Sequence, residues 1–197
     1  DVGLAIVRVA GEELRKLSSR LRGDLELVSE AVAQSTSAFE FAGEGLRGDK
    51  NFVLGVVKRD GCALSLASEE LQGDRDVVRA AAQQATYALD SASAALRADK
   101  DFMLEIAEHD WRALRYADAS VLADKQVLLA MCKHDWRALQ FASEELQGDK
   151  EVVLEFVKRD SRALQHASME LRSSKEVVLE ALNHSWVAIT HASEHLC

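Results

Sequence analysis

The hexapeptide HDWRAL occurs at residues 109–114 and again at residues 134–139. The two copies start 25 residues apart, and the same spacing governs the rest of the chain. Self-similarity at a fixed period is the sequence signature of a repeat architecture. The hexapeptide is therefore one window of a repeated unit and not a duplicated reaction site. Each unit starts with an Asp or a Ser, namely Asp24, Asp49, Asp74, Asp99, Asp124, Asp149 and Ser174.

Positions 1 to 25 of the repeat are counted from this Asp or Ser. Six units are complete, the first lacks two positions at its start, and the last lacks its final position. No insertion breaks the phase. The eight units are 1–23, 24–48, 49–73, 74–98, 99–123, 124–148, 149–173 and 174–197.

The first half of the unit has the pattern of a buried helix. The Asp at position 1 follows Gly or Ala, which is typical of a helix end followed at once by the N-cap of a new helix. Apolar residues occupy positions 4, 5, 8 and 9, as in Val152, Val153, Phe156 and Val157, and position 6 is usually Leu. These positions cover more than half of a helix circumference, so the helix is expected to contact neighbours on both sides.

The second half of the unit predicts another helix, with Asp or Ser at position 12 as its N-cap. Positions 15, 16, 19 and 23 are apolar, as in Ala138, Leu139, Ala142 and Leu146, and this spacing is helical. Position 20 is mostly Ser, which leaves open whether the second helix is continuous or broken. Helices this short are marginal alone, so they must stack. We predict an all-α fold, an α-solenoid of about eight stacked two-helix repeats forming a single helical-repeat domain over 1–197.

Composition narrows the class of protein. Apolar residues make up 48% of the chain and charged residues 29%, and there is no Pro, as expected for a globular helical protein. No apolar run is long enough to form a transmembrane segment. The net charge of −9 argues against nucleic acid as a partner. Cys62, Cys132 and Cys197 have no disulfide or zinc spacing and fit a reducing, intracellular location. The start at Asp1 suggests a processed chain, so an organelle such as a plastid stays open.

Two stretches suggest a family. The segments DKEVVLEFVKRDSRALQHASMEL (149–171) and DKNFVLGVVKRDGCALSLASEEL (49–71) resemble the repeats called domain of unknown function 4116, whose pattern is DKEVVLxAVKxxGxALxxASEEL. The resemblance extends over essentially the whole chain and is weakest in 1–23 and 74–98. It implies a helical repeat array that acts as an interaction platform, and an origin in an alga, another protist or an intracellular bacterium. It carries over no functional residues, because the family has no established activity.

Position 13 holds Trp in three repeats, whereas other repeats have Thr, Ser or Gly61 there. Trp and Gly would not alternate at a core position, because a large void would result, so position 13 is expected near the surface. Trp and Arg are enriched in binding hot spots. Alternatively, each indole folds over its own helix junction. Position 18 is also rich in aromatic residues, which is more typical of half-buried packing. The predicted binding residues are Trp111, Arg112, Trp136, Arg137 and Trp186, with Tyr116 and Phe141 as second choices.

These features favour a non-catalytic scaffold or adaptor that binds other proteins. No catalytic constellation is visible, so we predict no enzymatic activity, no cofactor and no metal. A variant makes the chain a peripheral subunit of a large assembly, such as an organellar or photosynthetic one. The last unit keeps the interior pattern, with Val177, Val178 and Leu179, so end-to-end self-association is a further option.

The alternative function is an enzyme, or a carrier of a ligand or metal, that uses His109, His134, His166 and His191 in the solenoid groove. Equivalent residues of neighbouring repeats lie roughly 8–10 Å apart, which is one helix-packing distance. Two His residues at that distance cannot share a zinc ion, whose ligands lie at about 2 Å. Helix ends also explain His and Asp at positions 11 and 12, since they suit the helix dipole and the N-cap.

Overall fold

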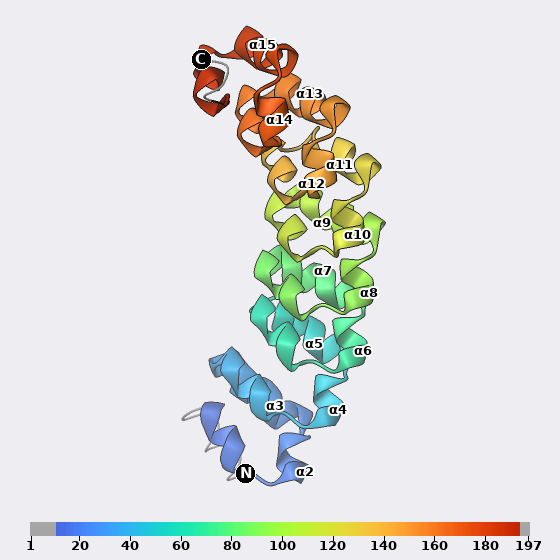
Figure 1. The fold of residues 1–197 in the computed structure, drawn as a ribbon. Coiled ribbons are helices and arrows are strands. Elements are labelled where there is room, and N and C mark those ends of the chain that lie inside the picture. The colour runs from blue at the N-terminus through green and yellow to red at the C-terminus, as the bar shows by residue number, and fades with distance from the viewer. Residues whose placement is uncertain (1–10, 194–197) are drawn as a thin grey trace. The chain divides into compact units, whose positions relative to one another are not determined.

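The computed structural model describes residues 11–193, and regular structure in this range is entirely helical (Figure 1). The repeat of 25 residues recurs in the structure without a change of phase. This confirms the predicted all-α solenoid of stacked repeats. None of the helices in the described range is long and apolar enough to cross a membrane.

Each of the six complete repeats contains three helical segments. The first is an α-helix that begins at position 2. These helices are α3 (Leu25–Gln34), α5 (Lys50–Val57), α7 (Arg75–Gln84), α9 (Lys100–His109), α11 (Lys125–Met131), α13 (Lys150–Arg159) and α15 (Lys175–His184).

The second segment is a 3-10 helix over positions 13 to 18. These helices are η1 (Gly11–Lys16), η2 (Thr36–Phe41), η3 (Gly61–Leu66), η4 (Thr86–Ser91), η5 (Trp111–Tyr116), η6 (Trp136–Phe141), η7 (Ser161–His166) and η8 (Trp186–His191). The third segment is one turn of α-helix over positions 21 to 24. These turns are α2 (Ser19–Arg22), α4 (Glu44–Arg47), α6 (Glu69–Gln72), α8 (Ala94–Arg97), α10 (Ala119–Leu122), α12 (Glu144–Gln147) and α14 (Met169–Arg172).

The second half of the repeat is therefore broken, which answers the question that position 20 left open. The N–H of the residue at position 20 donates to the carbonyl of position 24 in the preceding repeat. The Ser68 nitrogen lies 2.9 Å from the Arg47 oxygen, and the Ser168 nitrogen lies 2.9 Å from the Gln147 oxygen. The Ser68 hydroxyl also accepts from the Leu71 N–H and so caps the short helix α6. The break is stabilised by a bond between repeats, which a pattern within one repeat does not reveal.

The predicted N-caps are confirmed at the Asp residues named below, whereas Ser35 and Ser174 make no side-chain cap hydrogen bond. The Asp49 carboxylate accepts from the Phe52 N–H at 2.8 Å, and Asp24, Asp74, Asp99, Asp124 and Asp149 cap their helices in the same way. At position 12, the Asp110 and Asp135 carboxylates accept from the N–H two residues later and cap η5 and η6. The Asp side chains at positions 1 and 12 therefore fix where the first α-helix and the 3-10 helix of the repeat begin.

The hydrophobic core follows the predicted positions. In repeat 149–173, Val152, Val153, Phe156 and Val157 are fully buried, and so are Ala163 and Leu164 of η7. Helix α13 contacts α11 on one side and α15 on the other, and it also contacts η6 and η7. The expectation of neighbours on both sides is thereby confirmed. Leu154 at position 6 is half-buried.

Ion pairs join neighbouring repeats on the solvent side of this core. Lys125 at position 2 donates to Asp149 Oδ2 at 2.8 Å and to Glu151 Oε2 at 2.7 Å, both in the next repeat. Lys50 makes the same two contacts with Asp74 and Asp76. The hydrogen bond from Lys125, and then the N–H of Val152, lower the pKa of Asp149 below its ordinary value.

Replacing Asp149 with Ala is expected to lower the free energy of unfolding at neutral pH by about 1–2 kcal/mol, because a helix N-cap and an exposed ion pair are both lost. Asp149→Asn is the matched control and should cost less, since Asn still caps. Because the pKa of Asp149 is lowered in the folded state, its carboxylate stabilises the protein at pH values above the pKa of an unfolded Asp, about 4. This stabilisation is lost as the pH falls through the pKa of Asp149 in the folded state. The free energies of unfolding of the wild type and Asp149→Ala, measured in urea, should therefore converge in acid. An equal difference between the two free energies at every pH would contradict this.

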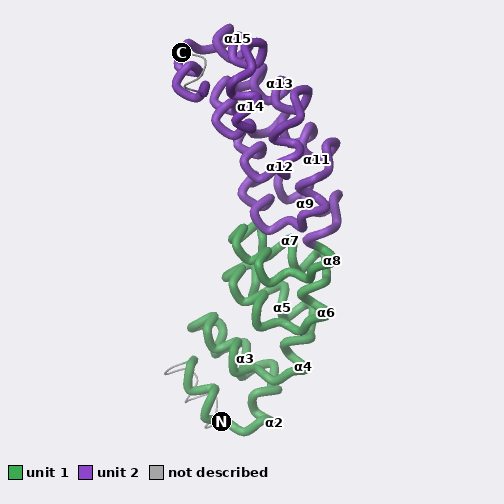
Figure 2. The backbone as a smooth tube through the Cα atoms, in the orientation of Figure 1, with its two compact units in different colours: residues 1–96 green, residues 97–197 purple. Residues whose placement is uncertain are grey.

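The chain is divided into two compact units, residues 1–96 and residues 97–197 (Figure 2), and the single helical-repeat domain over 1–197 stays a prediction. The two units are called unit 1 and unit 2. The boundary falls within repeat 74–98, and the repeat phase runs through it. Each unit is a stack of the same repeats.

Candidate binding surface

Trp111 and Trp136 each begin a 3-10 helix, and each indole packs on a ring of the next repeat. The ring centroids of Trp111 and Phe141 are 5.7 Å apart with an interplanar angle of 33°. Those of Trp136 and His166 are 5.8 Å apart at 27°. Both indoles are half-buried. Position 13 of one repeat therefore meets position 18 of the following repeat, so these side chains belong to the contact between repeats as well as to the surface.

Arginine side chains at position 14 lie over the indoles. The Arg137 guanidinium is 5.3 Å from the centroid of Trp111 and 5.6 Å from that of Trp136. Arg162 lies 4.9 Å from Trp136, and Arg112 lies 5.7 Å from Trp111. These are cation–π distances. The result is an alternating row, which we call the Trp–Arg ladder: Arg112, Trp111, Arg137, Trp136 and Arg162.

The Asp residues at position 12 hold the arginines of the ladder in place. Arg162 Nη2 lies 2.6 Å from Asp160 Oδ2, and its Nε also donates to this carboxylate. The hydrogen bond from Arg162 is the main cause that lowers the pKa of Asp160. Arg137 and Arg112 have looser pairs with Asp135 and Asp110, at 3.6 and 3.8 Å. Each of these Asp residues therefore caps a 3-10 helix, and Asp160 also orients the Arg162 guanidinium against an indole.

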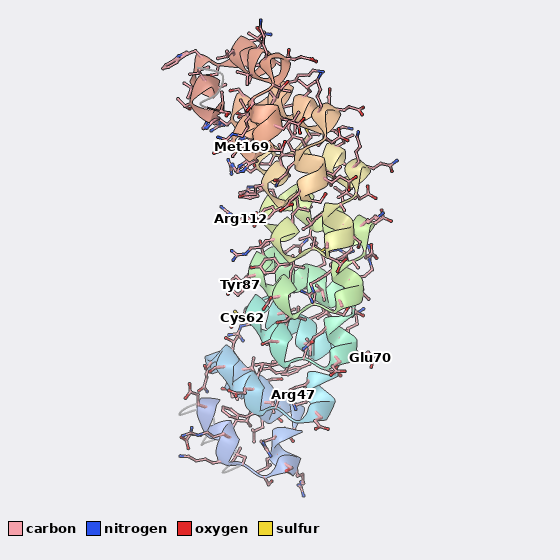
Figure 3. The ribbon with its side chains drawn as sticks, in the orientation of Figure 1. Arg47, Cys62, Glu70, Tyr87, Arg112 and Met169 are labelled. Atoms are coloured by element: carbon pink, nitrogen blue, oxygen red, sulfur yellow. The ribbon has the colours of Figure 1, made fainter. Side chains whose placement is uncertain are left out.

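The ladder unites four of the predicted binding residues and adds one that the sequence analysis missed. Arg162 could have been found because it occupies position 14, as Arg112 and Arg137 do. Of the second choices, Phe141 lies under Trp111, and Tyr116 is half-buried at the end of η5. Trp186 begins η8 and is 76% exposed. Arg112 extends outward from η5 at the edge of the ribbon (Figure 3).

The equivalent positions in unit 1 carry a different chemistry. The Thr36 hydroxyl donates to Asp60 Oδ2 at 3.1 Å, and the Gly61 N–H donates to Gln84 Oε1 at 2.7 Å. The exposed Cys62 thiol lies 2.8 Å from the Tyr87 hydroxyl (Figure 3). Among the residues described, indoles and guanidinium groups alternate only in unit 2, because all three Trp residues lie there.

The four His residues of the alternative function lie in four different repeats. His109 Nδ1 is 3.1 Å from the Glu105 carbonyl oxygen, and His134 Nε2 is 3.6 Å from Glu108 Oε1. His166 is packed under Trp136, and burial, followed by the charge of His191, lowers its pKa. Across residues 11–193, no group of three or more His, Cys, Asp or Glu residues could hold a metal ion.

The cysteines also lie apart. Cys132 is buried at position 9, and this burial raises the pKa of its thiol to about 11. A thiol with that pKa is a weak nucleophile near neutral pH. Cys62 lies in unit 1, on η3. Cys197 lies outside the described residues.

The stacked helices in constant phase define the class of this chain, an all-α solenoid built from tandem repeats. The sequence model of the family described as Domain of unknown function (DUF4116) matches it three times, over residues 49–97, 99–147 and 149–197, and the chain belongs to this family. Each match spans two repeats of 25 residues. The comparisons found no match among curated proteins and none among solved structures.

Proposed function

We propose that this chain is a non-catalytic scaffold or adaptor that binds another protein along the Trp–Arg ladder of unit 2. The observation that carries the proposal is the alternation of indole and guanidinium on successive repeats. Arg112 and Arg162 are exposed, and each turns one face to an indole. The guanidinium N–H groups of these two Arg residues are directed at solvent or at the carboxylate at position 12.

The geometry suits binding because the ladder is already ordered. Trp111 and Trp136 are fixed by the rings of the next repeat, so a partner that contacts them does not have to immobilise them. Side chains that are ordered before binding reduce the entropic cost of association. Trp and Arg are also the residues that most often dominate binding energy at protein interfaces.

Arginine substitutions test the proposal more cleanly than Trp substitutions, because the indoles also contribute to the contact between repeats. The double variant Arg112→Ala/Arg137→Ala should weaken binding of the native partner at least about tenfold, since each guanidinium loses charge-assisted contacts. Arg115→Ala is the matched control, because Arg115 is exposed on η5 and is no rung of the ladder. Its dissociation constant should stay within about twofold of the wild type.

The measurement is affinity capture from the native source, followed by titration of the captured protein against each variant. Far-ultraviolet circular dichroism should show the same helical signal in all three proteins. Equal losses in both variants, or no loss in the double variant, would contradict the proposal. The further suggestion that the partner belongs to a large organellar or photosynthetic assembly is tested in the same experiment, by the identity of what is captured.

A further inference from the structure

A cavity of about 470 Å³ lies between η7 and η8, next to the last rung of the ladder. Its volume falls within the range that is usual for ligand pockets. The four polar residues of segment 159–162 and two His residues of the next repeat surround it, together with small and apolar side chains. The lining residues are Arg159, Asp160, Ser161, Arg162, His184, Ser185, Val187, Ala188 and His191.

Beside this cavity, position 13 is Ser161, whereas the two preceding repeats have Trp there. In the two preceding repeats, the Trp at position 13 covers the residue at position 18 of the next repeat. In repeat 149–173, position 13 is Ser161, which is buried with 6% of its surface exposed. His191 at position 18 of the following repeat therefore has no indole over it and lines the cavity instead.

The walls of the cavity carry an excess of donors for an anion. Asp160 is the one carboxylate among the lining residues, and Arg162 is bound to it at 2.6 Å. Arg159 is a second cation on the wall, and its side chain also hydrogen-bonds the Cys132 thiol. The imidazoles of His184 and His191 add further nitrogen atoms, and His184 Nε2 lies 3.7 Å from Glu180 Oε1 outside the lining. Arginine and imidazole N–H groups form strong, charge-assisted hydrogen bonds with carboxylates.

The charge of the surrounding surface has the same sign. The segments 108–116, 133–141 and 158–166 include the ladder, and together they contain seven Lys or Arg and four Asp or Glu, a net charge of +3. The whole chain has a net charge of −9. A positive row on an acidic protein attracts acidic partners and repels basic ones.

We propose that the cavity between η7 and η8 receives a carboxylate side chain from an acidic peptide segment of the partner, while the rest of that segment lies along the Trp–Arg ladder. Arg162 belongs to both the ladder and the cavity, and so it joins the two parts of the site. The inference rests on the proposed function, and it specifies the chemistry of the partner and the place where the segment is anchored.

The experiment measures fluorescence anisotropy of a fluorescein-labelled peptide that alternates Glu with Ala, with the full chain as the binding protein. A peptide of the same length with Gln in place of Glu is the matched probe. Ser161→Trp restores the residue of the two preceding repeats and fills the cavity without removing a charge. Arg159→Ala removes one cation from the wall. Lys175→Ala is the control, because Lys175 is exposed and lies outside both the cavity lining and the three positive segments.

The Glu peptide should bind the wild type at least about tenfold more tightly than the Gln peptide does, because charged acceptors form the stronger hydrogen bonds. Ser161→Trp and Arg159→Ala should each lose about tenfold in affinity, and Lys175→Ala should lose less than about threefold. Circular dichroism confirms that each variant is folded. Equal binding of the two peptides would overturn the inference, and so would an unchanged affinity in Ser161→Trp. A protein that binds inorganic phosphate but does not bind the Glu peptide would also overturn it.

The two proposals fail separately. If Arg112→Ala/Arg137→Ala loses the native partner but Ser161→Trp and Arg159→Ala bind the Glu peptide normally, the ladder binds a partner and the cavity does not anchor it. If the cavity variants lose the peptide and the ladder variants keep the native partner, the scaffold proposal is wrong and the anion site is retained.

Discussion

Replacing Phe156 with Ala should lower the free energy of unfolding by about 3–5 kcal/mol, the largest single effect that we expect. Phe156 occupies position 8 of its repeat, within α13, and is 0% exposed. Helix α13 contacts elements of its own repeat and of both neighbouring repeats. The truncation leaves a cavity at a point where two contacts between repeats meet. The surrounding backbone is tied by caps and hydrogen bonds, so it cannot collapse fully into the space.

Trp fluorescence during urea unfolding is a suitable measurement, because the three Trp residues of the chain lie in the same unit as Phe156. Leu179→Ala provides the control. Leu179 is also apolar and helical, but it is 49% exposed, so its truncation should cost less than about 1 kcal/mol. Similar losses in the two variants would show that α13 is not the centre of a tightly packed core.

Two glycines of the same repeat should respond to Ala with opposite signs. A Cβ added to Gly61 would lie 2.5 Å from the carbonyl oxygen of Ala81 in the next repeat, so η3 and α7 would have to move apart. Gly61→Ala is expected to cost about 1–3 kcal/mol, as overpacking usually does. Gly55 lies within α5, and an added Cβ would meet nothing within 4 Å. Gly55→Ala should therefore stabilise the protein by about 0.5–1 kcal/mol, because Ala is the better helix former.

Thermal and urea unfolding, followed by far-ultraviolet circular dichroism, compare these two variants with the wild type. A destabilising Gly55→Ala would mean that the outer face of α5 is covered in solution. A neutral Gly61→Ala would mean that the contact between η3 and α7 is looser than in the structure. Either result would change the account of how neighbouring repeats in unit 1 approach each other.

The features that the sequence predicted are those that depend on neighbours along the chain. An Asp cap such as Asp49 and a core set such as Val152, Val153, Phe156 and Val157 are defined within a dozen residues, and the repetition of the pattern strengthens the prediction. The break at position 20 was left open, because a continuous and a broken helix bury the same apolar positions. It is stabilised by the bond from the Ser68 N–H to the Arg47 carbonyl, which joins two neighbouring repeats.

The candidate site was predictable by residue type and less so by geometry. Position 13 was expected near the surface because Trp and Gly alternate there, yet Gly61 and Ser161 are buried and Trp111 is half-buried. We expected that Gly at a buried Trp position would leave a large void. It does not, because the indole extends toward the next repeat and does not enter the core of its own repeat. Arg162 was missed for the same reason, since the indole that it covers belongs to the preceding repeat.

The ties between repeats have a consequence for how the protein forms during synthesis. The Lys–Asp pairs join residues 24 apart, and the backbone bond at position 20 spans a similar distance. Closing such short loops is fast, and folding with few long-range contacts is fast as well. A repeat inside either unit gains its partners as soon as the following repeat has left the ribosome. The nascent chain can therefore fold one repeat at a time. At each step, little more than the apolar face of the last folded repeat is exposed to solvent.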